Sequence, residues 1–383
     1  MRRAANYRYV PVYPVIRPSS LLPRPSKAFW AEYPDSSMTK FWCFTGRVAL
    51  YHGLRMLNVQ PGSTFLVPDY FQGTELWTLK HYGLKLKYYK INRDLSIDLG
   101  HLAHLDFGSC TAFYLIHYFG HPHPMGPVLD FCRSHKLLLV EDCAVAMFSK
   151  YAGRWLGSFG DLAIYSPYKS IGLPHGGLGA VRARDMARPE LQRPPLISTL
   201  LQIRDRFGRY LKARAPHGVE RSFSAATATA RRLLAVDRGT QVASGSAVWS
   251  PSTLGLDTSR LTRRMAQSEV AESVIEQRRY NFNYLVERLP NHIPILWRTL
   301  MDGECPLFLP LIVKERQAVQ KGLLDRGVES VAIWSDEQHD LTESVTEDVR
   351  HLRQTVMEIP VYQGLTRKDL EHLVDVISSV IRP

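Results

Sequence analysis

Residues Leu137–Val181 read LLLVEDCAVAMFSKYAGRWLGSFGDLAIYSPYKSIGLPHGGLGAV, and this segment contains two short apolar runs that each lead into reactive side chains. The runs, Leu137–Val140 and Leu162–Tyr165, have the length and composition of buried strands. The first leads to Asp142 and the second leads to Lys169. Because ligands bind beyond the carboxyl ends of the strands in an open α/β sheet, these two side chains are predicted to share a binding edge.

The pairing of this carboxylate with this lysine has a chemical meaning. A lysine becomes a nucleophile toward carbonyl groups when burial or a nearby cation lowers its pKa. An enzyme that uses pyridoxal 5'-phosphate (PLP) needs such a lysine, and it needs an aspartate that keeps the pyridine nitrogen protonated. The alternative interpretation is a helix cap at Asp142 and a solvated loop lysine at Lys169.

The surrounding motif resembles the DegT/StrS family of PLP-dependent aminotransferases. The signature of that family is roughly E-D-x-A-x-A, then G-x-x-G-x-x-G-D, then a serine, the Schiff-base lysine and a glycine pair. This chain has Glu141-Asp142-Cys143-Ala144-Val145-Ala146, then Gly153, Gly157 and Gly160-Asp161, then Ser166, Lys169 and Gly176-Gly177. The S-P-x-K-x-x-x-L-P-x-G-G version is typical of a divergent subgroup, and the resemblance extends from about Pro11 to the C-terminus.

The resemblance implies an α/β fold of the fold-type I PLP-dependent class, with a mostly parallel central sheet. Strand and helix patterns alternate before the central segment, which favours parallel strands joined by right-handed crossovers. We expect an extended N-terminal arm over residues 1–40, a large PLP-binding domain over 41–245 and a smaller C-terminal α+β domain over 246–383. In the last of these, a long helical pattern over Arg260–Arg288 precedes a strand–helix–strand–helix tail.

A phosphate site is predicted where Thr45-Gly46-Arg47 opens a helical pattern, because a helix N-terminus presents free backbone N–H groups to an anion. In the resembled family a similar turn holds the cofactor phosphate, which assigns Thr45, Gly46 and Ser166 to phosphate binding. Arg47 replaces the usual third residue and either adds a charge-assisted contact to the phosphate or points to solvent.

Position in the motif also assigns an aromatic residue to the pyridine ring, with Phe71 as the first choice and Tyr70 as the second. His117 follows another strand, and we expect a structural hydrogen-bonding role for it rather than a ligand contact. One departure is Val145, because most of the family has Gln or His there. Lys169 itself is kept, whereas the sugar dehydratases of the family carry His at that place.

Composition limits the class of protein. Of the 383 residues, 45% are hydrophobic and 22% are charged, which is ordinary for a globular protein, and no run of 18 apolar residues occurs. The five cysteines are scattered, and none lies in a C-x-x-C pair, which argues against a disulfide framework or a zinc site. The net charge of +12 fits an anionic substrate, and no nucleic-acid module or membrane partner is expected. Met1-Arg2-Arg3 precedes no signal-peptide run, so a cytoplasmic protein is predicted.

Three functions remain open at this point. The first is an aminotransferase that uses glutamate or glutamine as amino donor and a keto sugar, nucleotide-linked, or a related keto intermediate as acceptor, and that works as a homodimer. Lys169 and Asp142 would be its catalytic residues. The second is another PLP-dependent reaction, such as elimination, replacement or decarboxylation. The third is a non-catalytic binding protein on the same fold.

Overall fold

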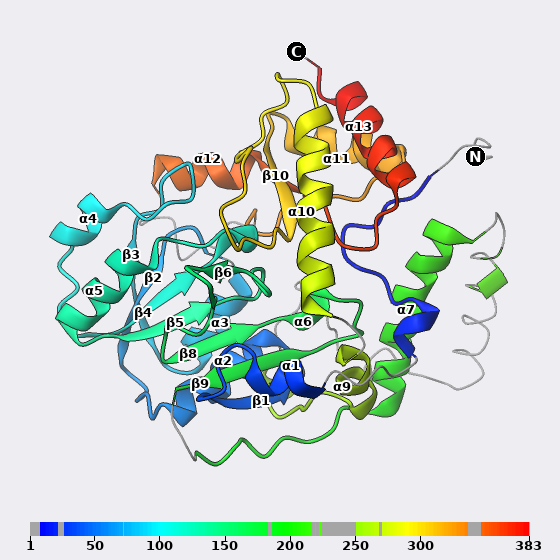
Figure 1. The fold of residues 1–383 in the computed structure, drawn as a ribbon. Helices are drawn as coiled ribbons and strands as arrows, with labels where there is room; N and C mark the ends of the chain where they lie inside the picture. Colours follow the sequence, from blue (N-terminus) through cyan, green and yellow to red (C-terminus); the bar gives the residue numbers. More distant parts are fainter. Residues whose placement is uncertain are drawn as a thin grey trace.

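The fold is known from a computed structural model (Figure 1). The structure describes residues 8–21, 27–71, 73–182, 186–215, 219, 222–223, 250–267, 270–335 and 346–382. The proposed domain boundary near residue 245 lies outside these residues. In the described part of the chain, no helix is both long and apolar enough to cross a membrane.

A seven-stranded sheet forms the centre of the larger body of the molecule, and the predicted α/β class is confirmed. Its order is β1 (Thr39–Cys43), β9 (Gly177–Val181), β8 (Leu162–Tyr165), β5 (Leu138–Asp142), β4 (Cys110–Ile116), β2 (Thr64–Pro68) and β3 (Lys85–Tyr89). Strand β9 runs antiparallel to both of its neighbours, and the other pairs in the sheet are parallel. A short hairpin, β6 (Lys150–Tyr151) and β7 (Arg154–Trp155), lies between β5 and β8 in the chain.

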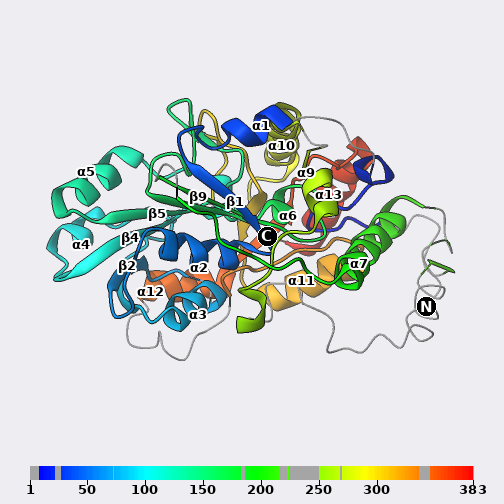
Figure 2. The same ribbon diagram turned by 90° about the horizontal axis from the view of Figure 1, so that it is seen from below.

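Helices cover both faces of this sheet. Figure 2 shows α2 (Gly46–Met56) and α3 (Gly73–His81) on one side, with α1 (Lys27–Glu32) and α5 (Met125–His135) on the other. The helix α4 (Leu99–His104) follows β3 in the chain, and α6 (Pro167–Ser170) is the four-residue helix that follows β8. Central strands such as β8 are buried along their whole length, as expected for strands covered on both faces.

A second, smaller sheet pairs β10 (Phe308–Ile312) with β11 (Val356–Pro360) in antiparallel register. Its helices are α10 (Ala271–Arg288), α11 (Arg316–Asp325), α12 (Glu347–Thr355) and α13 (Arg367–Val380), and Figure 1 shows them grouped around β10. The helix α12 is not among the predicted elements. The single helix expected over Arg260–Arg288 is instead two, α9 (Arg260–Ala266) and α10, because the chain at Val270 has extended backbone.

The described part of the N-terminal segment packs against later parts of the same chain. Val10 pairs with Val328 and donates its N–H to the carbonyl of Gly327 at 2.8 Å. Tyr9 contacts the helix α7 (Leu196–Arg214), since the Lys212 ammonium lies 3.6 Å from its ring centroid. The helix α1 falls inside the segment for which an extended arm was expected, so that segment is only partly extended.

Candidate functional site

Asp142 is the last residue of β5, and its carboxylate is held from two sides. The Tyr114 hydroxyl donates to Oδ2 at 2.7 Å, and the backbone N–H of Ala144 donates to Oδ1 at 2.9 Å. Tyr114 comes from the neighbouring strand β4, whose register sets Ile116 opposite Asp142. Two hydrogen bonds to a buried carboxylate fix its direction as well as its position.

Burial raises the pKa of Asp142 to about 6, and the negative charge of Glu75 acts in the same direction. The hydrogen bonds from Ala144 and Tyr114 and the positive charge of Lys169 act against this rise. The carboxyl group is therefore ionised at neutral pH, which is the state that can keep a pyridine nitrogen protonated.

The two aromatic candidates lie in different surroundings. The Phe71 ring lies 5.1 Å from the ring of Tyr114, the residue that binds Asp142. The Tyr70 ring packs instead against Tyr118 and Trp334, at 5.5 and 5.7 Å. Phe71 is thus the candidate whose ring packs against the residue that donates to the Asp142 carboxylate.

Lys169 lies on α6, which directly follows the carboxyl end of β8, and it is 6% exposed. Within the described residues, no carboxylate lies within ion-pair distance of its ammonium group. Two acidic groups interact with it electrostatically: Asp142, on the large sheet, and Glu358, on β11 of the small sheet. Glu358 is fully buried and accepts the N–H of Ile333 at 3.1 Å.

The predicted phosphate residues meet at the start of α2. Thr45 is the N-cap of this helix but makes no side-chain cap bond. A Cβ on Gly46 would lie 2.7 Å from the Ser166 Oγ, so the turn lies directly against the segment that carries Lys169. The buried Thr45 Oγ1 and Arg47 Nη1 have no hydrogen-bond partner among the described residues. Unpaired buried donors at a helix N-terminus fit a phosphate group.

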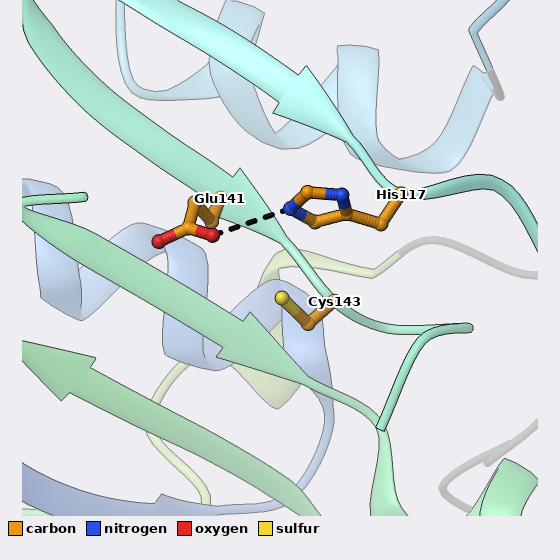
Figure 3. Close-up of side chains that lie close together, drawn as sticks. All are labelled: His117, Glu141 and Cys143. Atoms are coloured by element: carbon orange, nitrogen blue, oxygen red, sulfur yellow. Dashed lines mark hydrogen bonds and ion pairs between the residues drawn. The ribbon is translucent and has the colours of Figure 1, made fainter. Parts of the chain in front are cut away.

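A second buried polar cluster, drawn in Figure 3, includes Glu141 and Cys143, the two residues that flank Asp142 in the chain. The possible ligand atoms of His117, Glu141 and Cys143 all lie within 4.8 Å of one another. The Glu141 carboxylate, however, accepts the N–H groups of Gly157, Phe159 and Gly160 at 2.8, 2.8 and 2.6 Å, besides its 3.2 Å contact to His117. Its lone pairs are therefore used to fix the glycine loop before β8, and His117 has a structural hydrogen-bonding role.

Val145 is buried in the core, where its side chain offers no hydrogen bond. Two site residues were missed by the sequence analysis. Tyr114 carries no local signal, since it is one of two adjacent aromatic residues in a buried strand. Glu358 could have been noticed, because a single acidic residue in the apolar run Val356–Val361 is unusual in a buried strand.

This chain is similar to known proteins of one family. Residues 43–192 match the model of the DegT/DnrJ/EryC1/StrS aminotransferase family. A GDP-perosamine synthase of Escherichia coli O157:H7 is 28% identical over 136 residues, which are 35% of this chain and 37% of that protein. A dTDP-4-dehydro-2,3,6-trideoxy-D-glucose 4-aminotransferase of Saccharopolyspora spinosa is 30% identical over 123 residues, 32% of each chain. The matched segments span about a third of the length of these curated relatives.

Two solved structures share the fold. A sugar aminotransferase from Micromonospora echinospora has a TM-score of 0.64 at 20% identity and covers 96% of this chain and 99% of its own. An Escherichia coli GDP-4-keto-6-deoxy-D-mannose-3-dehydratase with bound hydrated PLP has a TM-score of 0.64 at 16% identity, with 91% and 90% covered. At these identities the likeness concerns the fold alone.

Proposed function

We propose that this chain is a PLP-dependent aminotransferase, because its residues 43–192 match the model of the DegT/DnrJ/EryC1/StrS aminotransferase family. Its acceptor is a keto sugar, nucleotide-linked, or a related keto intermediate, and its donor is glutamate or glutamine. The relatives named above support the acceptor class, because one of them is an aminotransferase of a dTDP-linked dehydro sugar. The net charge of +12 also favours an anionic substrate.

The observation that carries the proposal is the pairing of Asp142 with Lys169 at the carboxyl ends of two adjacent parallel strands. Both side chains are buried, and the carboxylate is oriented by Tyr114 and Ala144. A capping aspartate and a solvated lysine would not need this arrangement. Fold alone would supply only an analogy, whereas this pair supplies the chemistry.

The roles of the residues follow from their positions. Thr45, Gly46, Arg47 and Ser166 would hold the phosphate group of PLP, and Phe71 would cover its ring. Bound PLP supplies an electron sink for the substrate carbon that loses a proton.

Within that assembly the carboxylate and the lysine have separate tasks. Asp142 would keep the ring nitrogen protonated. The Nζ of Lys169 would hold the cofactor and would move the proton at the substrate carbon. The proposal also includes that the protein forms a homodimer and that it is located in the cytoplasm.

A second candidate is a different PLP-dependent reaction, such as elimination, replacement or decarboxylation. The observation that favours it is Val145, whose buried apolar side chain cannot supply the hydrogen bond that Gln or His supplies in most of the family. One structural neighbour is a dehydratase, although its likeness to this chain concerns the fold only. Product analysis with and without a keto acceptor separates the two reactions.

The test is the visible absorption spectrum of the purified protein mixed with PLP, before and after the addition of L-glutamate. Lys169→Ala is the informative variant, and Lys85→Ala, which removes an exposed lysine at the start of β3, is the matched control. We expect a band in wild type and Lys85→Ala that is missing in Lys169→Ala. Glutamate should convert this band to the spectrum of the amine form of the cofactor.

Each other outcome has a distinct meaning. A band that depends on Lys169 but ignores glutamate, glutamine and other donors would favour the second candidate. A protein that binds no PLP would contradict the proposed cofactor and favour a non-catalytic binding role on this fold.

A further inference from the structure

The backbone carbonyl of Ser170, the residue after Lys169, accepts two hydrogen bonds from the C-terminal half of the chain. The Arg278 Nη2 donates to it at 2.6 Å, and the Gln363 Nε2 donates to it at 3.2 Å. Arg278 lies on α10, and Gln363 follows β11. The last carbonyl of the helix that carries the reactive lysine is therefore held by the smaller sheet and its helices.

Arg278 is fully buried, and its guanidinium joins three segments. Besides Ser170, it donates to the carbonyl of Pro306 at 3.3 Å and, through Nε, to the Gln363 Oε1 at 3.1 Å. A buried cation is costly unless its donors are satisfied. The planar, multidentate head of arginine can satisfy several oxygens at once, whereas lysine presents a point charge.

The helix α6 needs such support, because it has only four residues. A single helical turn is unstable by itself, so its position depends on the groups that bind its ends. At the N-terminal end, Ser166 lies against Gly46 of the predicted phosphate turn. At the C-terminal end, the Ser170 carbonyl is bound by Arg278 and Gln363. Since Lys169 and Ser170 are consecutive residues of this one-turn helix, bonds that fix the Ser170 carbonyl also restrict movement of the Lys169 backbone.

We propose that Arg278, assisted by Gln363, is a positioning residue for Lys169. It holds the Ser170 carbonyl and so directs the lysine amine toward the aldehyde group of PLP. This inference rests on the proposed function, in which Lys169 is the reacting amine. It adds a dependence of that amine on the C-terminal half of the chain. A misplacement of about 1 Å at a reacting group can slow a reaction by about a hundredfold.

The test measures how fast Lys169 captures PLP. The adduct is trapped with borohydride and located on the chain by mass spectrometry, and visible circular dichroism of the bound cofactor reports its orientation. The variants are Arg278→Gln and the milder Gln363→Ala. The matched control is Arg279→Gln, because Arg279 on the same helix also donates to two backbone carbonyls, those of Met301 and Glu304 at 3.0 and 2.7 Å, neither of which belongs to α6.

We expect capture at Lys169 to slow by about tenfold or more in Arg278→Gln and by a smaller factor in Gln363→Ala, with altered circular dichroism in both. Arg279→Gln should capture PLP at the wild-type rate even where its melting temperature falls. Arg278→Lys should recover part of the rate, because it retains the charge and one donor.

Equal capture rates in Arg278→Gln and Arg279→Gln would overturn the inference and leave Arg278 a purely structural role. If Arg278→Gln does not fold, Gln363→Ala decides, and a wild-type rate in that variant contradicts the inference. Wild-type protein that captures no PLP at Lys169 would overturn the proposed function as well, which separates the two failures.

Discussion

Replacing Glu358 with glutamine should remove a pH-dependent loss of stability from the folded protein. Glu358 is fully buried on β11, and its carboxyl accepts the N–H of Ile333 at 3.1 Å. Burial raises the pKa of this carboxyl from 4.5 to about 8, and the positive charges of Arg316 and Lys169 oppose the rise only in part. Glutamine has the same shape, accepts the same backbone hydrogen bond and does not titrate.

The sign follows from proton binding in the two states. Between pH 4.5 and 8 the folded protein keeps the Glu358 proton while the unfolded chain releases it, so the free energy of unfolding falls as the pH rises. The slope approaches 1.4 kcal/mol per pH unit for one group. Over the whole window the loss amounts to about 5 kcal/mol, and above pH 8 it no longer grows.

The assay is urea unfolding of cofactor-free wild type and Glu358→Gln at pH 5 to 9. The difference between the two proteins isolates Glu358, because the other titrating groups, Asp142 among them, are common to both. We expect similar stability near pH 5 and an advantage for the variant of several kcal/mol at pH 9. Two stability curves that stay parallel across this range would refute the burial of an ionisable carboxyl at this position.

Three further predictions concern the site and its support. Gly46→Ala places a methyl group 2.7 Å from a serine hydroxyl and should weaken PLP binding about tenfold in an absorbance titration, whereas Gly126→Ala, which meets no atom within 4 Å, should bind normally. Tyr114→Phe removes a donor to Asp142 and should move the pH dependence of the cofactor spectrum to higher pH; an unchanged profile would contradict the role of that bond. Glu141→Gln disturbs a carboxylate that binds three backbone N–H groups and should lower stability by about 2 kcal/mol or more, and a wild-type melting temperature would argue against the anchoring role.

Local sequence patterns determined most of the elements and the two central residues of the site. The apolar runs before Asp142 and Lys169 are strands, as predicted, because an apolar run between turn residues has few other ways to bury its side chains. Parallel strands point their carboxyl ends to one edge, so the sequence alone could place the two residues at one end of the sheet. The start of α2 at Gly46 was also predictable, since caps are local features.

Only the tertiary structure decided which side chains meet across those elements. The bond between Tyr114 and Asp142 depends on the register of two strands, and the bond between Arg278 and Ser170 joins residues 108 positions apart. The contact of the Phe71 ring with Tyr114, and of the Tyr70 ring with Trp334, likewise depends on packing. Periodicity and capping report a residue's own element and face, whereas these contacts depend on how separate elements pack, which no local pattern encodes.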